Sequence, residues 1–169
     1  MNSDMRFNTT EYLVDRFLDE LIRFALIYVR NKDDAQDVVQ QVFLTYLQRK
    51  PVFVNEDHAK RWLMKVTVNT AKNFKRGREN SNVSFDEIEG GVASGHTFGR
   101  TDEEQAVYEA VMSLKRSYRE IVHLYYYEDM TSAQIASILG ITEGGVRARL
   151  ARARTALEQI LKGGAADEK

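Results

Sequence analysis

Apolar residues in the first 50 positions recur every three or four residues, which is the spacing of one face of an α-helix. The recurrence is interrupted at Arg30, Asn31 and Lys32 and then resumes. The pattern therefore predicts two amphipathic helices. Their apolar faces are Leu13, Phe17, Leu21, Ala25 and Tyr28 in the first helix, and Val38, Val39, Val42, Phe43, Tyr46 and Leu47 in the second.

The second helix carries signals at both ends. Asp33 and Asp34 follow the interruption and suit the N-cap and first turn, where a carboxylate accepts main-chain N–H groups and favours the positive end of the helix dipole. Lys50 precedes Pro51, and the residue before a proline disfavours the helical conformation. We expect the second helix to stop there and a short loop to run from Val52 to Asp57.

A third helix is predicted from about His58. One of its faces is apolar and another is cationic, so we expect the first to pack in a core and the second to meet a polyanion. The apolar face is expected to be Ala59, Trp62 or Leu63, Val66, Thr70 and Phe74, and the polar stripe to be Arg61, Lys65, Asn69, Lys72 and Arg76.

Periodicity disappears after the third helix. Five of the ten glycines lie between residues 77 and 99, together with Ser, Asn and acidic residues. We expect residues 79–101 to form a flexible acidic linker. The linker would separate an N-terminal domain of residues 1–78 from a C-terminal domain of residues 102–163, with a short tail over 164–169.

Helical spacing returns after the linker. Two residue pairs have the spacing of a capping box, and two single residues suit a left-handed C-cap and an N-cap: Thr101 with Glu104, Thr131 with Gln134, Gly140 and Thr142. Apolar positions at helical spacing are Val107, Ala110, Val111, Leu114, Tyr118, Ile121, Val122, Tyr125, Ile135, Ala136, Leu139, Val146, Leu150, Ala153, Leu157 and Leu161. The sequence thus predicts an all-α fold of two small helical domains.

Residues 131–150 have the spacing of a helix-turn-helix. A small Ala136 stands where two helices would cross, Gly140 suits the turn, and Ile141 supplies an apolar contact. The second helix carries four arginines around its apolar stripe: Arg147, Arg149, Arg152 and Arg154. Four guanidinium groups around a packed stripe indicate contact with phosphate, although a basic helix of this kind is about as often a solvated surface helix. The paired capping boxes and the second basic block of the chain favour a DNA-binding C-terminal domain.

Net charge is only −1, but it is unevenly distributed. Residues 58–78 hold seven basic side chains and no acidic one, residues 79–104 hold one basic and seven acidic, and residues 131–162 hold five basic and two acidic. Two basic blocks are thus separated by an acidic one. We expect a polyanion to be met at two places.

Several classes of function are excluded by composition. The chain has no cysteine, and its three histidines (His58, His96 and His123) lack metal-ligand spacing. No Gly-rich phosphate loop or nucleophilic serine stands in a suitable context, so we expect neither an enzyme nor a cofactor. No apolar run approaches the ~20 residues of a membrane span. We expect no membrane insertion, a cytoplasmic location and a monomer when free.

Three blocks resemble the extracytoplasmic function sigma factors of the sigma-70 family, which direct bacterial RNA polymerase to promoters. Asp34–Phe43 (DAQDVVQQVF) and Arg61–Asn69 (RWLMKVTVN) resemble the N-terminal domain of that family, and Tyr118–Arg154 resembles its promoter-reading C-terminal domain. The chain departs from the family in having Gly145 where Thr is common, and at Ser132, Gln36, Gln41 and Asn73.

The resemblance implies that the last helix reads the minus-35 promoter element in the major groove. There Glu143 would accept from cytosine and Arg147 would donate to guanine, while other arginines hold phosphates or pack against the domain. The implied minus-35 set is Thr142, Glu143, Gly144, Gly145, Arg147, Arg149, Arg152 and Arg154.

The third helix would open the minus-10 element and capture an extruded base. Capture needs an amide or backbone edge for hydrogen bonds, an apolar or aromatic wall, and cations for the strand, all of which are available between Val52 and Arg76. The implied minus-10 set is Arg61, Trp62, Lys65, Asn69, Lys72 and Arg76, although the place of Trp62 in the apolar stripe favours a core position.

The implied partners are promoter DNA and core RNA polymerase, through the beta-prime clamp helices and the beta flap. The clamp helices would meet Asp34, Asp37, Gln40, Gln41 and Leu44, and the acidic members of this set also suit the first turn of the helix. Many relatives are held inactive by an anti-sigma factor, and the residues leave open whether this chain has one.

Two other functions are kept as alternatives. A stand-alone helix-turn-helix regulator would need a dimer surface and a sensor pocket, and neither is evident in the sequence. A protein-binding helical adaptor would leave the arginines of the last helix unexplained.

Overall fold

The computed structural model describes residues 3–79 and 101–167 of the chain, and all regular secondary structure in these ranges is helical. The chain divides into two compact units, Met1–Val83 and Ser84–Lys169. The prediction of an all-α fold with two helical units is confirmed. Apart from Glu79 and Thr101, the predicted linker lies outside the described residues.

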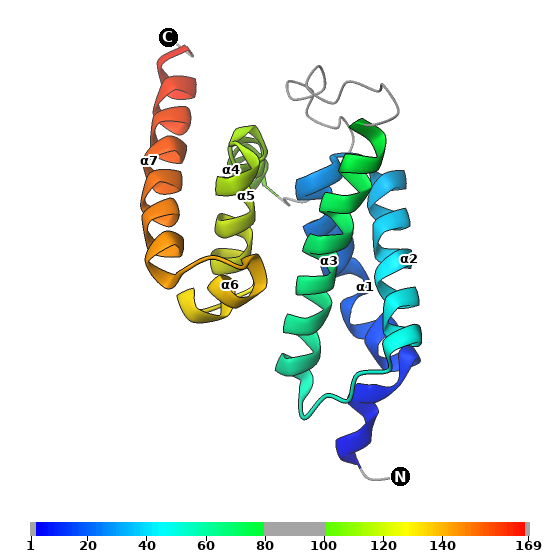
Figure 1. Ribbon diagram of the computed structural model, residues 1–169. Coiled ribbons are helices and arrows are strands. Elements are labelled where there is room, and N and C mark those ends of the chain that lie inside the picture. Colours follow the sequence, from blue (N-terminus) through cyan, green and yellow to red (C-terminus); the bar gives the residue numbers. More distant parts are fainter. Residues whose placement is uncertain (1–2, 80–100, 168–169) are drawn as a thin grey trace. The chain divides into compact units, whose positions relative to one another are not determined.

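The first unit is a bundle of three helices preceded by a short 3₁₀ helix. Its elements are η1 (Ser3–Asn8), α1 (Thr10–Val29), α2 (Lys32–Arg49) and α3 (Glu56–Glu79), and each α-helix packs against the other two (Figure 1). The predicted apolar face of α1 is fully buried. Ion pairs link α1 to α3, since Arg16 pairs with Glu56 and Lys60 lies 3.6 Å from Glu20.

The N-cap of α2 differs from the prediction. The cap is Asn31, whose backbone is extended and whose side-chain oxygen accepts from the Asp34 N–H at 2.8 Å. Asp33 and Asp34 therefore lie in the first turn. Asparagine serves as well as aspartate at an N-cap, so the pattern alone does not distinguish Asp33 from Asn31, two positions earlier. Leu47, predicted in the apolar face, is exposed.

α3 begins at Glu56, two residues before the predicted start, because the Asn55 side chain accepts from the His58 N–H at 2.8 Å and caps the helix. Ala59, Leu63 and Val66 are buried as expected, whereas Thr70 and Phe74 are only partly buried. The buried face is wider than one stripe because α3 packs against both α1 and α2. The additional buried residues are Met64, Thr67, Val68 and Ala71.

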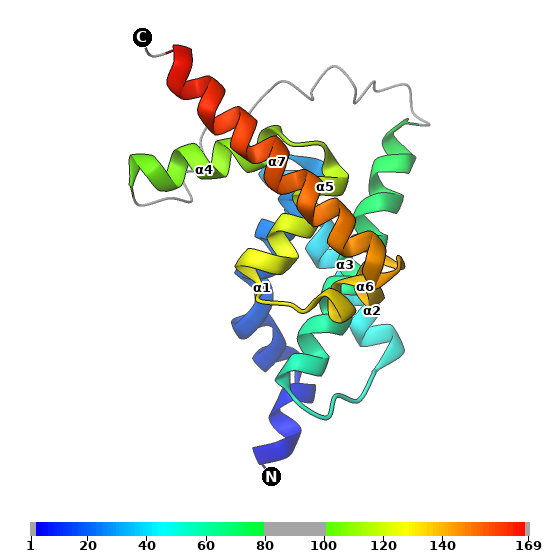
Figure 2. The same cartoon turned by 90° about the vertical axis from the view of Figure 1, so that its left-hand side faces the viewer.

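The second unit consists of α4 (Asp102–Ser113), α5 (Arg116–Val122), the π-helix η3 (His123–Tyr127), α6 (Ser132–Leu139) and α7 (Glu143–Asp167). α7 packs along α5 and α6 (Figure 2) and extends to Asp167, into the segment predicted as a tail. The core includes Ile121, Leu124, Ile135, Val146 and Ala153.

The predicted caps of the second unit are confirmed. Thr101 with Glu104 and Thr131 with Gln134 both form complete capping boxes. Gly140 has φ 68° and is the left-handed C-cap of α6, a conformation that costs glycine little. The apolar pattern fails at two ends, because Val107 near the start of α4 and Leu161 near the end of α7 are exposed.

Candidate nucleic-acid interface

The N-terminus of α7 is open to solvent. Thr142 caps the helix, its hydroxyl accepting from the Gly145 N–H at 3.0 Å and its carbonyl accepting from Val146. Thr142, Glu143 and Gly144 are exposed, and Gly145 is partly exposed. A Cβ at Gly145 would lie 3.1 Å from the Thr142 hydroxyl, so glycine leaves room for the cap. The first turn of α7 can therefore approach a ligand with little side-chain obstruction.

Glu143 and Arg147 lie one turn apart on this exposed end. Their carboxylate and guanidinium are 3.6 Å apart, and both side chains are more than half exposed. An exposed ion pair of this kind is weak, typically well below 1 kcal/mol. Both groups can therefore separate to contact bases, one as an acceptor and one as a donor.

The other arginines of the predicted minus-35 set differ in their surroundings. Arg149 lies 3.8 Å from the buried carboxylate of Glu120 on α5. Arg154 donates from Nε to the Tyr126 hydroxyl at 2.7 Å and also lies over the Tyr125 ring. The hydrogen bond to Tyr126 raises the pKa of Arg154 above its ordinary value, so the guanidinium stays charged.

Arg152 is exposed on α7. The helix thus divides its four arginines into two kinds. Arg149 and Arg154 hold α7 against the rest of its unit, whereas Arg147 and Arg152 are presented to solvent.

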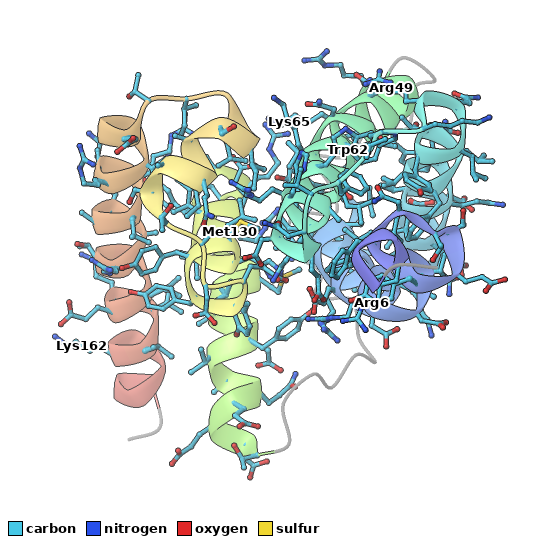
Figure 3. All side chains as sticks on the ribbon, turned by 90° about the horizontal axis from the view of Figure 1, so that it is seen from below. Arg6, Arg49, Trp62, Lys65, Met130 and Lys162 are labelled. Atoms are coloured by element: carbon cyan, nitrogen blue, oxygen red, sulfur yellow. The ribbon has the colours of Figure 1, made fainter. Side chains whose placement is uncertain are left out.

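On α3 the predicted polar stripe faces outward along most of its length. Lys65, Asn69 and Arg76 are exposed, and Arg61 and Lys72 are partly exposed. Arg61 donates to the Asp57 carbonyl of its own first turn at 3.3 Å. Figure 3 shows Lys65 on the same helix as Trp62, one turn further along. The stripe provides cations and an amide on one helix face.

Trp62 is partly buried, so its ring has both a packed side and a solvent-accessible edge. Its ring packs on Phe53 at 5.7 Å and meets Tyr46 edge-on at 6.3 Å between centroids. Burial raises the pKa of Tyr46, so its hydroxyl is a protonated donor at neutral pH. These three rings form an aromatic cluster at the end of the bundle where α2 leads into α3.

A groove of about 600 Å³ runs between α2 and α3. It brings together residues that sequence reasoning assigned to two partners, because Asp37 and Gln41 of the polymerase set face Asn69 of the minus-10 set. Sequence reasoning did not assign a site role to Thr45, Arg49, Thr70, Asn73 or Phe74, which also line the groove. Amide groups beside an aromatic ring are suited to hold an unstacked base.

The predicted polymerase-binding set on α2 is divided. Asp37, Gln40, Gln41 and Leu44 are exposed. Asp34 is buried, and its carboxylate accepts from the Asn31 side chain at 2.6 Å. The first-turn interpretation therefore holds for Asp34, while Leu47 extends the exposed apolar part of this face.

Two negative findings concern the described residues only. No group of three or more His, Asp or Glu in these ranges is placed to hold a metal ion. None of the helices there is long and apolar enough to span a membrane.

Comparisons with known proteins agree with the division into two units. Residues 13–80 match the family described as sigma-70 region 2, and residues 104–157 match sigma-70 region 4. The chain is 32% identical to the RNA polymerase sigma factor SigV of Bacillus subtilis over 134 residues, covering 79% of this chain and 80% of SigV. It is 31% identical to the ECF RNA polymerase sigma factor SigL of Mycobacterium tuberculosis, covering 89% and 87%.

A solved structure is also similar. It contains the sigma factor RpoE of Bartonella quintana in complex with the anti-sigma factor NepR, with a TM-score of 0.69 and 25% sequence identity. The match covers 90% of this chain and 96% of that one.

Proposed function

Since the chain belongs to the sigma-70 family, within its extracytoplasmic function group, it is a promoter-specific sigma factor of RNA polymerase that acts in transcription initiation, and we propose how its residues divide that work. Sigma factors act by binding polymerase and promoter DNA, so the residues to be explained are contacts rather than catalytic groups.

The second unit reads the minus-35 element through α6 and α7. The first turn of α7 enters the major groove, Glu143 and Arg147 contact base edges, and Arg152 contacts a phosphate. Thr142, Gly144 and Gly145 let the helix end come close to the duplex. Arg149 and Arg154 act indirectly, by fixing the orientation of α7 on its own unit.

The first unit holds the melted minus-10 element on α3. Lys65, Lys72 and Arg76 attract the single strand, and Asn69 offers an amide edge to an unstacked base at the mouth of the groove. Arg61 and Trp62 lie at the start of the same surface. The partial exposure of Trp62 supports contact with DNA at its free edge, with the rest of the ring packed on Phe53.

The exposed face of α2 docks on the beta-prime clamp helices of core polymerase. Asp37, Gln40, Gln41 and Leu44 form this surface, and Asp34 is left out because its carboxylate is buried against Asn31. A strong partner is required on energetic grounds. Opening about ten base-pair steps at ~1.4 kcal/mol each costs roughly 14 kcal/mol, whereas capturing one or two bases returns only ~1–3 kcal/mol each.

One observation carries this proposal. Each of the two units matches a different sigma-70 region and presents one polar helix face to solvent, on α3 in the first unit and on α7 in the second. An anti-sigma factor of the kind seen with RpoE would inhibit this chain by covering the exposed faces of α2 or α7.

Transcription with purified components tests the proposal. The chain is added to core RNA polymerase from its own organism with a genomic DNA library, and the transcripts are sequenced. We expect starts downstream of one shared pair of promoter elements. A core enzyme that works with another sigma factor but gives no new transcripts with this chain would contradict the proposal.

A matched pair of variants tests the docking face. Leu44→Asp, on the exposed face of α2, should abolish co-elution with core polymerase, whereas Leu18→Asp, at an exposed leucine of α1, should not. Equal effects of the two changes would argue against docking through α2.

A further inference from the structure

The loop between α2 and α3 presents two apolar side chains to solvent. Val52 and Val54 are each 79% exposed, while Phe53 between them is 2% exposed. Single exposed valines are common on protein surfaces. Here two of them flank a buried anchor in the loop that leads into α3, so they form a small apolar wall at a defined place.

Phe53 fixes the middle of this loop in the aromatic cluster. Its ring stacks on Tyr46 at 6.1 Å, packs on Trp62 at 5.7 Å and meets His58 edge-on at 5.3 Å between centroids. The imidazole of His58 also accepts from the Val54 N–H at 3.3 Å. The loop is therefore attached to the first turns of α3, close to Trp62.

Asn8, the last residue of η1, holds the same loop from the other side. Its amide exchanges two hydrogen bonds with the main chain of Phe53, donating to the carbonyl at 3.1 Å and accepting from the N–H at 2.6 Å. The Tyr46 hydroxyl donates to the Asn8 carbonyl at 2.6 Å. In Figure 1, η1 and the loop lie at the same end of the bundle.

The chemistry of this contact requires an amide. A carboxylate could accept from the Phe53 N–H but would face the Phe53 carbonyl with a second acceptor, and an alanine would leave both main-chain groups to water. The paired bonds fix both the N–H and the carbonyl of the residue between Val52 and Val54. They therefore reduce the freedom of both valines at once, which lowers the entropy cost of binding a ligand there.

We infer that Asn8 is a positioning residue for promoter melting: it holds the loop so that Val52 and Val54 form an apolar wall against which one unstacked base of the minus-10 strand is bound. The inference rests on the proposed role of α3. The cations of Arg61 and Lys65 lie in the first three turns of α3, after the loop, and suit the backbone of the same strand. Asn8 itself does not touch the base.

Abasic substitution measures this wall directly. Holoenzyme made with core polymerase is bound to single-stranded minus-10 oligonucleotides in which each base is removed in turn. The ratio of affinities with and without a base reports the contact at that position. With Val52→Ala and Val54→Ala together, we expect the ratio at one position to fall about fivefold, the lower part of the range for holding one base.

Asn8→Ala should lower the ratio at the same position and leave the other positions unchanged. Because Asn8 acts through the valines, adding Asn8→Ala to the double valine variant should produce no further fall. A loss of folding stability alone would not select one base position. Tyr46→Phe is the matched control, since it removes the bond to the Asn8 carbonyl and leaves the amide pair with Phe53 intact.

Two results would overturn the inference. The first is that Asn8→Ala lowers the melting temperature of the protein but leaves the affinity ratio with and without a base unchanged at every position. The second is that adding Asn8→Ala to the double valine variant lowers this ratio further. If Asn8→Ala does not fold, Asn8→Asp carries the same comparison, because it keeps the acceptor for the Phe53 N–H. Failure of the wild-type chain to form a promoter-binding holoenzyme would instead reject the proposed function.

Discussion

The polar faces of α3 and α7 differ in what their side chains contact within the protein. On α7, two of four arginines are engaged by other elements of the unit, Arg149 by Glu120 and Arg154 by Tyr126. On α3, Lys65 and Asn69 are exposed, and Asn69 lines the groove shared with α2. The number of cations on a helix therefore exceeds the number that are available to contact DNA.

The difference fits two kinds of DNA binding. Reading a duplex requires a helix held rigidly at a fixed angle, so under the proposed function the arginines that brace α7 would serve recognition without touching a base. Holding a melted strand requires exposed cations beside a cavity for an unstacked base, as α3 provides. Substitutions on α3 should therefore reduce promoter melting, and substitutions on α7 should reduce the preference for the cognate minus-35 element.

The largest effect is expected on α3. Replacing Lys65 and Asn69 together by alanine should raise the activation free energy of open-complex formation on duplex promoter by about 2 kcal/mol or more. The change removes a cation for the strand and the amide edge for a captured base. Binding to a template with a pre-melted bubble should be affected less. Permanganate footprinting on both templates measures the difference.

Lys32→Ala is the matched control for that experiment, because Lys32 is an exposed lysine at the start of α2 and outside the groove. It should leave both templates unaffected. Equal defects of the Lys65 and Asn69 variant on duplex and bubble would show that α3 binds DNA without assisting melting.

The next effect concerns Arg147. Arg147→Ala should weaken use of the cognate minus-35 element by about 1–3 kcal/mol, because it removes a donor to a base edge, and should weaken binding to random DNA much less. Competition between cognate and scrambled elements measures the ratio. A loss of the same size on both sequences would reassign Arg147 to a phosphate.

The helices and most caps could be predicted from the sequence because they depend on residues three or four positions apart. Both capping boxes and Gly140 are examples. Asn31 was missed in favour of Asp33 and Asp34, since all three are good capping residues and only the backbone conformation selects one.

Long-range partners could not be predicted by periodicity. Tyr126 and Arg154 are 28 positions apart, and Asn8 and Phe53 are 45 apart. Each pair meets only because elements distant in the sequence pack together. The division of the arginines on α7 and the anchoring of the valine loop therefore required the structure, while the choice of α3 and α7 as the polar helices did not.

A smaller effect separates bracing from recognition on α7. Arg154→Ala should lower the free energy of unfolding by about 1 kcal/mol, because it removes a hydrogen bond to Tyr126 and the contact with two tyrosine rings. Urea unfolding measures the loss. The loss of preference for the cognate element should be smaller in Arg154→Ala than in Arg147→Ala, because Arg154 acts only through the orientation of α7. An equal loss of preference without any loss of unfolding free energy would make Arg154 a reading residue.

The smallest effect is expected at Arg152, the other arginine of α7 that is presented to solvent. If Arg152 binds a phosphate, Arg152→Ala should release one fewer counterion, so the slope of log affinity against log salt concentration should become shallower by about 0.9. Unfolding should change by less than about 0.5 kcal/mol, because no packed contact is lost. The affinity loss should be equal on all sequences.

Fluorescence anisotropy over a salt series measures the slope, with Arg154→Ala as the matched arginine variant. A slope unchanged in Arg152→Ala but reduced in Arg154→Ala would reverse the assignment of the two arginines and show that a cation held by Tyr126 still reaches the DNA backbone.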